Sequence, residues 1–173
     1  MALIKSVRGM TPAFGKDCFL AENCTVTGDV IMGELCSVWF NAVIRGDVNS
    51  IRIGNRVNIQ DNSMVHCTYK KTTVNIGNNV SIGHNVIVHG ADIQDNVLVG
   101  MGAVLMDDVF VGTGSVIAAG AVVIEGTIIE PYSVYAGVPA RLIKKADQAK
   151  HLEMIERIAR NYIRYAGWYR NEP

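Results

Sequence analysis

An aliphatic residue recurs every six positions through most of this 173-residue chain, and no other feature constrains its fold as strongly. The longest unbroken series is Ile93, Val99, Leu105, Val111, Ile117, Val123, Ile129 and Tyr135. Earlier members of the same frame are Leu20, Val26, Met32, Val38, Ile44, Ile53, Ile59, Val65, Ile76, Ile82 and Val88. A period of six matches neither the 3.6-residue period of a helix nor the alternation of a single strand. It indicates a solenoid built from short repeated units.

A small or β-branched residue stands two positions before most of these aliphatic residues, as Ala103 stands before Leu105. Residues two apart point to the same side of a strand, so both face the interior. The residues that separate one such pair from the next, rich in Gly, Asn and Asp, must turn a corner. Three units return the chain to its start, with successive coils about 4.8 Å apart. We therefore predict a mainly β protein, a hexapeptide parallel β-helix of about six coils spanning residues 1–140.

The pattern changes after Pro139. Asp147 is suited to cap a helix, and the apolar residues that follow it have helical spacing. They are Leu152, Ile155, Ala159, Tyr162, Ile163 and Ala166. We predict that the segment 141–173 forms a long terminal helix packed along the β-helix.

Charge and composition exclude several classes of protein. Sixteen basic and sixteen acidic residues give a formal net charge of zero, which argues against a nucleic-acid or membrane-surface partner. The N-terminus lacks a secretory signal, and no long uncharged run exists, so we expect a soluble, cytoplasmic protein. The cysteines (Cys18, Cys24, Cys36 and Cys67) lack Cys-x-x-Cys spacing, and we expect buried free thiols.

Three of the four histidines, His66, His84 and His89, fall where the repeat is interrupted. The frame gains three residues between Ile44 and Ile53, gains five between Val65 and Ile76, and loses one between Val88 and Ile93. A purely structural solenoid has no need of such interruptions. Loops that project from a rigid scaffold commonly carry function, and imidazole is the commonest protein metal ligand.

The six-residue frame assigns these histidines to faces. His66 and His89 each follow an aliphatic position and lie one coil apart, so their imidazoles should be close enough to share a metal ion. Arg45 occupies the same position one coil below His66. His84 stands one position later in its unit and lies on another face, so a second copy of the chain must supply it.

Two half-sites follow from this placement. One comprises Arg45, Asp47, His66 and His89, and the other comprises Gln60, Asp61 and His84. Joining unlike faces is heterologous and closes into a ring when the rotation suits. For a three-sided prism we predict a homotrimer.

The motifs at these positions resemble the γ-class carbonic anhydrase family. They are Val43-Ile44-Arg45-Gly46-Asp47, Asn58-Ile59-Gln60-Asp61-Asn62, Val65-His66, Gly83-His84 and His89-Gly90. The resemblance covers essentially the whole chain and implies a left-handed β-helix and a homotrimer with a divalent metal at each interface. His66 and His89 would come from one subunit and His84 from its neighbour. Zinc is the metal implied, with iron(II) or cobalt(II) as alternatives, and the activity implied is hydration of CO2 to bicarbonate by a metal-bound hydroxide.

Other residues have competing interpretations. Arg45, Asp47 and Asp61 would shape the electrostatics of the site, or would form salt bridges that hold the trimer. Gln60 would hydrogen-bond metal-bound solvent or bicarbonate. Tyr162 resembles a family tyrosine that reaches the site from the terminal helix, or else it is a core-facing aromatic. Cys67 could be a ligand or a redox-sensitive thiol, but packing is the simpler interpretation.

One departure from the family pattern affects the predicted activity. Active members carry a glutamate in the loop after the first metal histidine, whereas the loop here, Cys67 to Thr73, has no carboxylate. This favours, as an alternative to the enzyme, a non-catalytic metal-binding or assembly protein. A hexapeptide acyltransferase or a CoA thioesterase is a further alternative, because many acyltransferases share the repeat.

Overall fold

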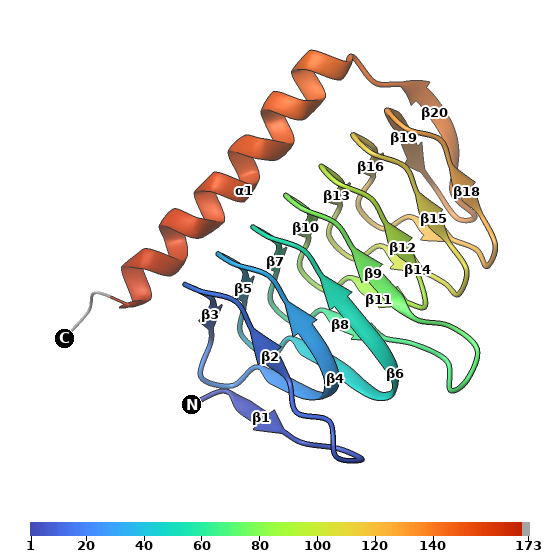
Figure 1. Ribbon diagram of the computed structural model, residues 1–173. Coiled ribbons are helices and arrows are strands. Elements are labelled where there is room, and N and C mark those ends of the chain that lie inside the picture. Colours follow the sequence, from blue (N-terminus) through green and yellow to red (C-terminus); the bar gives the residue numbers. More distant parts are fainter. Residues whose placement is uncertain (171–173) are drawn as a thin grey trace.

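Short strands on three faces stack coil upon coil, and one long helix lies beside the stack (Figure 1). This computed structural model describes residues 1–170. Nearly all strand pairs are parallel, and register partners belong to successive coils, as Val65, Val88 and Leu105 do. The predicted β-helix with a terminal helix packed along it is therefore confirmed.

We name the three faces by what they carry. The helix face consists of β3 (Phe19–Leu20), β5 (Ser37–Val38), β7 (Asn58–Ile59), β10 (Ser81–Ile82), β13 (Leu98–Val99), β16 (Val116–Ile117) and β19 (Ser133–Ala136), followed by the antiparallel β20 (Arg141–Lys145). The histidine face consists of β1 (Leu3–Lys5), the first parts of β4 (Thr25–Met32) and β6 (Val43–Ile53), then β8 (Met64–His66), β11 (Ile87–His89), β14 (Val104–Leu105) and β17 (Val122–Val123). The third face consists of β2 (Ala13–Phe14), the remainder of β4 and β6, then β9 (Val74–Ile76), β12 (Asp92–Ile93), β15 (Phe110–Val111) and β18 (Ile128–Ile129).

The stack contains seven coils, since the helix-face sheet has eight strands and the last, β20, is antiparallel. This is one more than the sequence repeat indicates. The additional coil uses Leu3–Lys5 and Ala13–Phe14, which pair with β4 although they precede the first recognisable repeat position, Leu20. Pairing of β1 and β2 with β4 thus adds a coil in a segment that lacks the six-residue pattern.

The interior is filled by the aliphatic positions of the repeat. Val99, Leu105 and Ile117 have no exposed surface, and together with their equivalents in other coils they form one continuous core. The corner residues Asn62 and Asn85 have φ near +60°, a conformation that Asn adopts more readily than most residues. The periodic Asn, Asp and Gly residues thus suit the corner conformation, although Leu35 and Arg56 also adopt it.

The strands β4 and β6 turn continuously from the histidine face onto the third face. Gly28 in β4 and Gly46 in β6 are register partners, and a Cβ on Gly28 would collide with the Gly46 carbonyl group. The inserted residues between Ile44 and Ile53 lie just beyond this corner. Asp47, within this segment, lies beside His66 at the end of β8.

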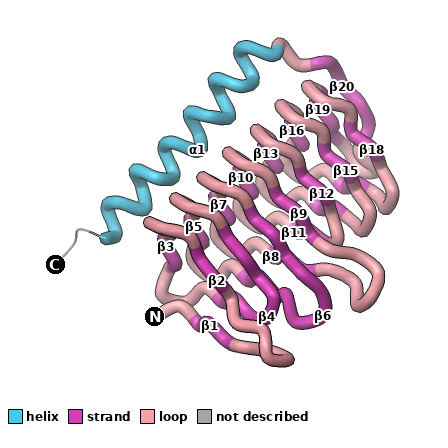
Figure 2. Tube along the Cα trace, viewed as in Figure 1, coloured by secondary structure: helices cyan, strands magenta, loops and turns pink. Residues whose placement is uncertain are grey.

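Helix α1 (Gln148–Arg170) runs from the last coil back towards the first along the helix face (Figures 1 and 2). Asp147 caps it by accepting a hydrogen bond from the Lys150 backbone N–H at 3.2 Å. Near its end, Tyr169 packs on Phe19 and Trp39. Residues 171–173 of the predicted terminal segment lie outside the described residues. Within residues 1–170, the helix lacks the combination of length and apolarity needed to cross a membrane.

Candidate metal centre

His66 and His89 are register partners at the ends of β8 and β11. His66 Nδ1 lies 3.2 Å from His89 Nε2, and the two ring centroids are 5.2 Å apart. The stacking predicted from the six-residue frame is therefore present. Both side chains project outward from the histidine face and are partly buried.

Asp47 holds the opposite nitrogen of His66. The Asp47 Oδ1 atom lies 3.2 Å from His66 Nε2, and its Oδ2 atom accepts a hydrogen bond from Arg45 Nη1 at 2.6 Å. Burial raises the pKa of Asp47, but the hydrogen bond and charge of Arg45 outweigh it and leave that pKa lowered. Burial, and then the charge of Arg45, lower the pKa of His66. This environment favours neutral imidazole, the form that binds metals.

Asp107 holds the opposite nitrogen of His89, and sequence reasoning missed it. Its Oδ1 atom lies 2.8 Å from His89 Nδ1, and it also accepts hydrogen bonds from Thr68 and Thr72 in the loop after β8. Burial raises the pKa of Asp107, yet the hydrogen bonds from Thr68, His89 and Thr72 leave it lowered. A signal was available in the repeat, because Leu105 stacks on Val88 and Asp107 therefore stacks on Gly90.

His84 lies at the corner that follows β10, away from the other two histidines. Its Nδ1 atom lies 2.8 Å from Asp61 Oδ2, and Asp61 occupies the same corner one coil below. The His84 side chain is 40% exposed. Across residues 1–170, no group of three or more His, Cys, Asp or Glu side chains is arranged to hold a metal within one chain.

The His66–His89 pair fits the donor requirements of a divalent metal. Two histidine nitrogens bound to one tetrahedral zinc at about 2.0–2.1 Å lie about 3.3 Å apart, close to the observed 3.2 Å. When the protons of both rings lie on the nitrogens that face the carboxylates, the two facing nitrogens present lone pairs to a cation between them. A carboxylate behind each histidine is the usual arrangement around metal-binding imidazoles.

Comparisons with known proteins identify the family. A "Carbonic anhydrase" from Geobacillus kaustophilus is 41% identical over 168 residues, which are 97% of this chain and 91% of that protein. "Gamma carbonic anhydrase 2, mitochondrial" from Arabidopsis thaliana is 38% identical over 176 residues, or 98% of this chain and 62% of that protein. The chain belongs to the γ-class carbonic anhydrase family. No family model matches it.

A solved structure also shares the whole fold of this γ-class chain. A Bacillus cereus protein, provisionally named an acetyltransferase, superimposes with a TM-score of 0.93 at 36% identity and covers 97% of this chain and 96% of that one. The hexapeptide β-helix is thus common to proteins with carbonic anhydrase and transferase names. The fold alone does not distinguish a carbonic anhydrase from a transferase, so the distinction depends on the side chains of the site.

Gln60 and Tyr162 lie on the His84 side of this γ-class site. Gln60 is buried, and its Nε2 atom donates to Asn58 Oδ1 at 2.9 Å. Tyr162 lines a hollow of about 250 Å³ together with Asp61 and His84. Burial, followed by the charge of Asp61, raises the pKa of Tyr162 to about 12. Both interpretations of Tyr162 are compatible with this position, because its ring also packs edge-on against Trp39.

The cysteines are free, as expected. Cys24, Cys36 and Cys67 are buried as predicted, but the prediction is wrong for Cys18, which is partly exposed. Burial, followed by the charges of Asp47 and Asp107, raises the pKa of Cys67. A protonated thiol is a poor metal ligand, so the packing interpretation of Cys67 is favoured.

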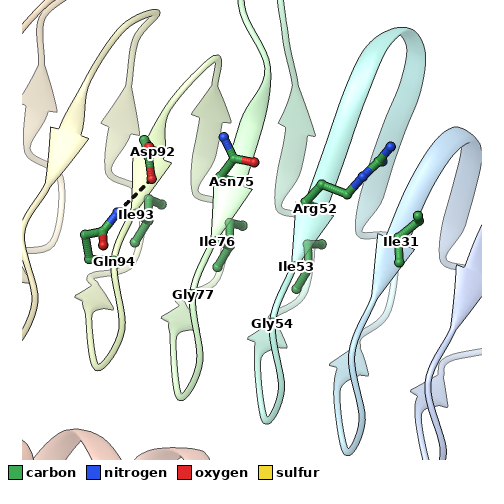
Figure 3. Close-up of a pocket in the computed structure, with 10 residues that line it drawn as sticks. All are labelled: Ile31, Arg52, Ile53, Gly54, Asn75, Ile76, Gly77, Asp92, Ile93 and Gln94. Atoms are coloured by element: carbon green, nitrogen blue, oxygen red, sulfur yellow. Dashed lines mark hydrogen bonds between the residues drawn. The ribbon is translucent and has the colours of Figure 1, made fainter.

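A larger open groove on the third face has different chemistry. It has a volume of about 350 Å³, and Figure 3 shows Arg52, Asn75, Asp92 and Gln94 along it. Gln94 donates to Asp92 at 3.0 Å, and Arg52 pairs with Asp29 at 2.8 Å. Arg52, Asp92 and Gln94 thus already have polar partners, and its described lining residues include neither histidine nor cysteine.

Proposed function

We propose that three copies of this chain assemble into a ring and bind a divalent metal at each interface. His66 and His89 of one subunit and His84 of the next would supply the ligands, and the assembly would hydrate CO2 to bicarbonate. The observation that carries this proposal is the pair of facing nitrogens on His66 and His89. Carboxylates lie at their opposite nitrogens and favour the protons there, an arrangement that would direct both lone pairs at one point between the coils.

The need for a partner subunit follows from the position of His84. Its ring lies at a corner between faces, outside the prism, and is exposed beside Asp61. Apolar side chains are also exposed around this level: Ile87, Met106 and Ile124 on the histidine face, and Met101 at the His84 corner. An exposed apolar patch of this kind is typical of a protein–protein contact, and burying it would favour the ring.

Three histidines leave a fourth metal position open, which is the arrangement of catalytic sites. A zinc ion held there lowers the pKa of its bound water to about 7, and iron(II) and cobalt(II) suit the same donors. The carboxylates of Asp47, Asp61 and Asp107 fix which nitrogen of each histidine is free. We also propose that the protein acts in the cytoplasm.

The residues around the ligands have separate roles in this proposal. Arg45 fixes Asp47 and places a positive charge beside His66. Gln60, held through its amide nitrogen by Asn58, keeps its carbonyl oxygen free to accept a hydrogen bond. Tyr162, neutral at physiological pH, would orient CO2 or bicarbonate from the hollow that it shares with His84.

The decisive test is metal analysis of anaerobically purified protein combined with a CO2 hydration assay. We expect stoichiometric metal and hydration that scales with metal content for zinc or iron(II) protein. A fully metallated trimer with no hydration above buffer, with either metal, would falsify the enzymatic proposal. It would leave the metal-binding part intact.

A second candidate is a non-catalytic, metal-binding assembly protein. It is favoured by the loop after His66, which has no acidic residue and instead carries Lys71, paired with Glu125 at 2.6 Å. The acyl-transfer alternative rests on the repeat that acyltransferases share and on the transferase names of structural neighbours. Incubation with acetyl-CoA and other thioesters decides it, because unchanged thioesters would exclude that chemistry.

A further inference from the structure

The Asp107 carboxylate connects three parts of the chain that are distant in sequence. Its Oδ2 atom accepts a hydrogen bond from Thr68 Oγ1 at 2.6 Å, and its Oδ1 atom accepts one from Thr72 Oγ1 at 3.2 Å. The same Oδ1 lies 2.8 Å from His89 Nδ1. The side chain is only 13% exposed. A carboxylate held from so many directions has little freedom to rotate, so it can fix the ring that it contacts.

The loop between β8 and β9 is folded so that it presents these hydroxyl groups. The Thr68 backbone N–H donates to Thr72 Oγ1 at 3.0 Å, and the N–H groups of Lys71 and Thr72 donate back to the Thr68 carbonyl. Lys71 then fastens the loop to the next coils through Glu125. The five residues inserted into the repeat therefore form a compact clamp on Asp107.

Gly90 provides the space for this clamp. A Cβ at this position would collide with Asp107 Oδ1 and with Thr72 Oγ1, so any larger residue would displace the carboxylate. Gly90 also has φ +61°, a left-handed conformation that glycine adopts without steric cost. The absence of a side chain at Gly90, directly after His89, thus leaves room for the Asp107 carboxylate one coil above.

We infer that Asp107 is a positioning residue for His89: it keeps the proton on Nδ1 and aims the Nε2 lone pair at His66. The inference rests on the proposed metal centre, which it deepens by assigning a function to the loop that lacks the family carboxylate. In this chain the carboxylate that meets the loop comes from the coil above. Asp107 touches His89 rather than substrate, so it acts through the orientation of the ligand.

Metal affinity tests this inference in the full-length protein. In a competition between the protein and a chromophoric chelator for zinc, Asp107→Ala should weaken binding by about 10–100-fold. Asp107→Asn should lose less, because its amide oxygen can still accept the hydrogen bond from His89. Asp108→Ala is the matched control: Asp108 is the next residue, 55% exposed, and its contact in this cluster is a 3.7 Å approach to Lys71. We expect affinity within about 2-fold of wild type for this control.

A second measurement needs no metal and separates this inference from the proposed function. Long-range proton–nitrogen NMR of the metal-free protein reports the tautomer of each histidine. His89 should carry its proton on Nδ1 in the wild type and lose that preference in Asp107→Ala, with an unchanged circular dichroism spectrum. An Nε2-protonated His89 in the wild type, or equal zinc affinity of the Asp107→Ala and Asp108→Ala variants, would overturn the inference. A wild-type protein that shows the Nδ1 tautomer but binds no zinc would overturn the proposed function alone.

Discussion

His66 Nδ1 and His89 Nε2 face one another at 3.2 Å across neighbouring coils, while Asp47 and Asp107 hold their opposite nitrogens. In this arrangement, when the proton of each ring is on the nitrogen that faces its carboxylate, both facing lone pairs can bind one cation. The β-helix imposes it, because its register places the two histidines exactly one coil apart. The predictions below test the consequences for metal binding, assembly and stability.

His84→Ala should abolish stoichiometric metal binding without unfolding the chain. The His84 ring is exposed, and its pair with Asp61 is of a kind that contributes about 0–1 kcal/mol to stability. Elemental analysis and circular dichroism measure the two effects. His151→Ala is the control, because it removes a histidine outside the proposed ligands and should leave metal content unchanged. Retention of full metal content in His84→Ala would refute its assignment as a ligand.

Ile117→Ala should destabilise the chain by about 2–5 kcal/mol, because it opens a cavity inside the prism. Ile117 has no exposed surface, whereas Ile128 is 65% exposed on the third face. The matched Ile128→Ala variant should change stability by no more than about 0.5 kcal/mol. Urea denaturation of both variants provides the comparison. Similar losses in the two variants would contradict the assignment of inward and outward positions.

Asp47 should give the metal-free protein a stability contribution that depends on pH. The net effect of its surroundings lowers its pKa in the folded chain, below the value of about 3.9 expected in the unfolded chain. A carboxyl group whose pKa is lowered by folding stabilises the folded chain fully at pH values above its pKa in the unfolded chain. This stabilisation is lost as the pH falls through its pKa in the folded chain. The melting temperature of wild type should therefore exceed that of Asp47→Asn near neutral pH, and the difference should shrink below about pH 4. A difference that stays constant across that range would argue against the Arg45–Asp47 pair.

Cys18 should be the thiol that reacts first with iodoacetamide in the native protein. It is partly exposed, whereas Cys24, Cys36 and Cys67 are buried. Mass spectrometry should find a single adduct on the folded chain and four adducts after denaturation. The Cys18→Ser variant should remain unmodified while folded. Rapid labelling of Cys67 would instead indicate that the loop after β8 opens readily.

The fold and the pairing of His66 with His89 could be predicted because both depend on a strict repeat. Once the period is six and three units form a coil, position in the frame specifies a face, and residues eighteen apart in the regular part of the frame stack on one another. Counting positions within the frame, with the five inserted residues left out, also placed His84 above Asp61, and the two side chains lie 2.8 Å apart. Local periodicity was sufficient because a solenoid uses mainly contacts between neighbouring repeats.

Asp107 and the first coil were not predicted, for two different reasons. The repeat stacks Asp107 on Gly90, but its direct 2.8 Å contact with His89 depends on a carboxylate orientation that hydrogen bonds from Thr68 and Thr72 in the loop after β8 set. The first coil lacks the aliphatic frame, and its strands are held by pairing with β4. Neither the orientation of the Asp107 carboxylate nor the pairing of the first coil is encoded in the spacing of apolar residues.

The sequence by itself determined the β-helix, its terminal helix and the faces on which the three histidines lie, because side-chain direction follows from a fixed period. Only the tertiary structure decided which nitrogen of each histidine is held and which is free. That choice depends on the positions of three carboxylates, Asp47, Asp61 and Asp107, each brought to its histidine by a contact between chain segments. Hydrogen-bond geometry at this scale is set by the packing of loops against neighbouring coils.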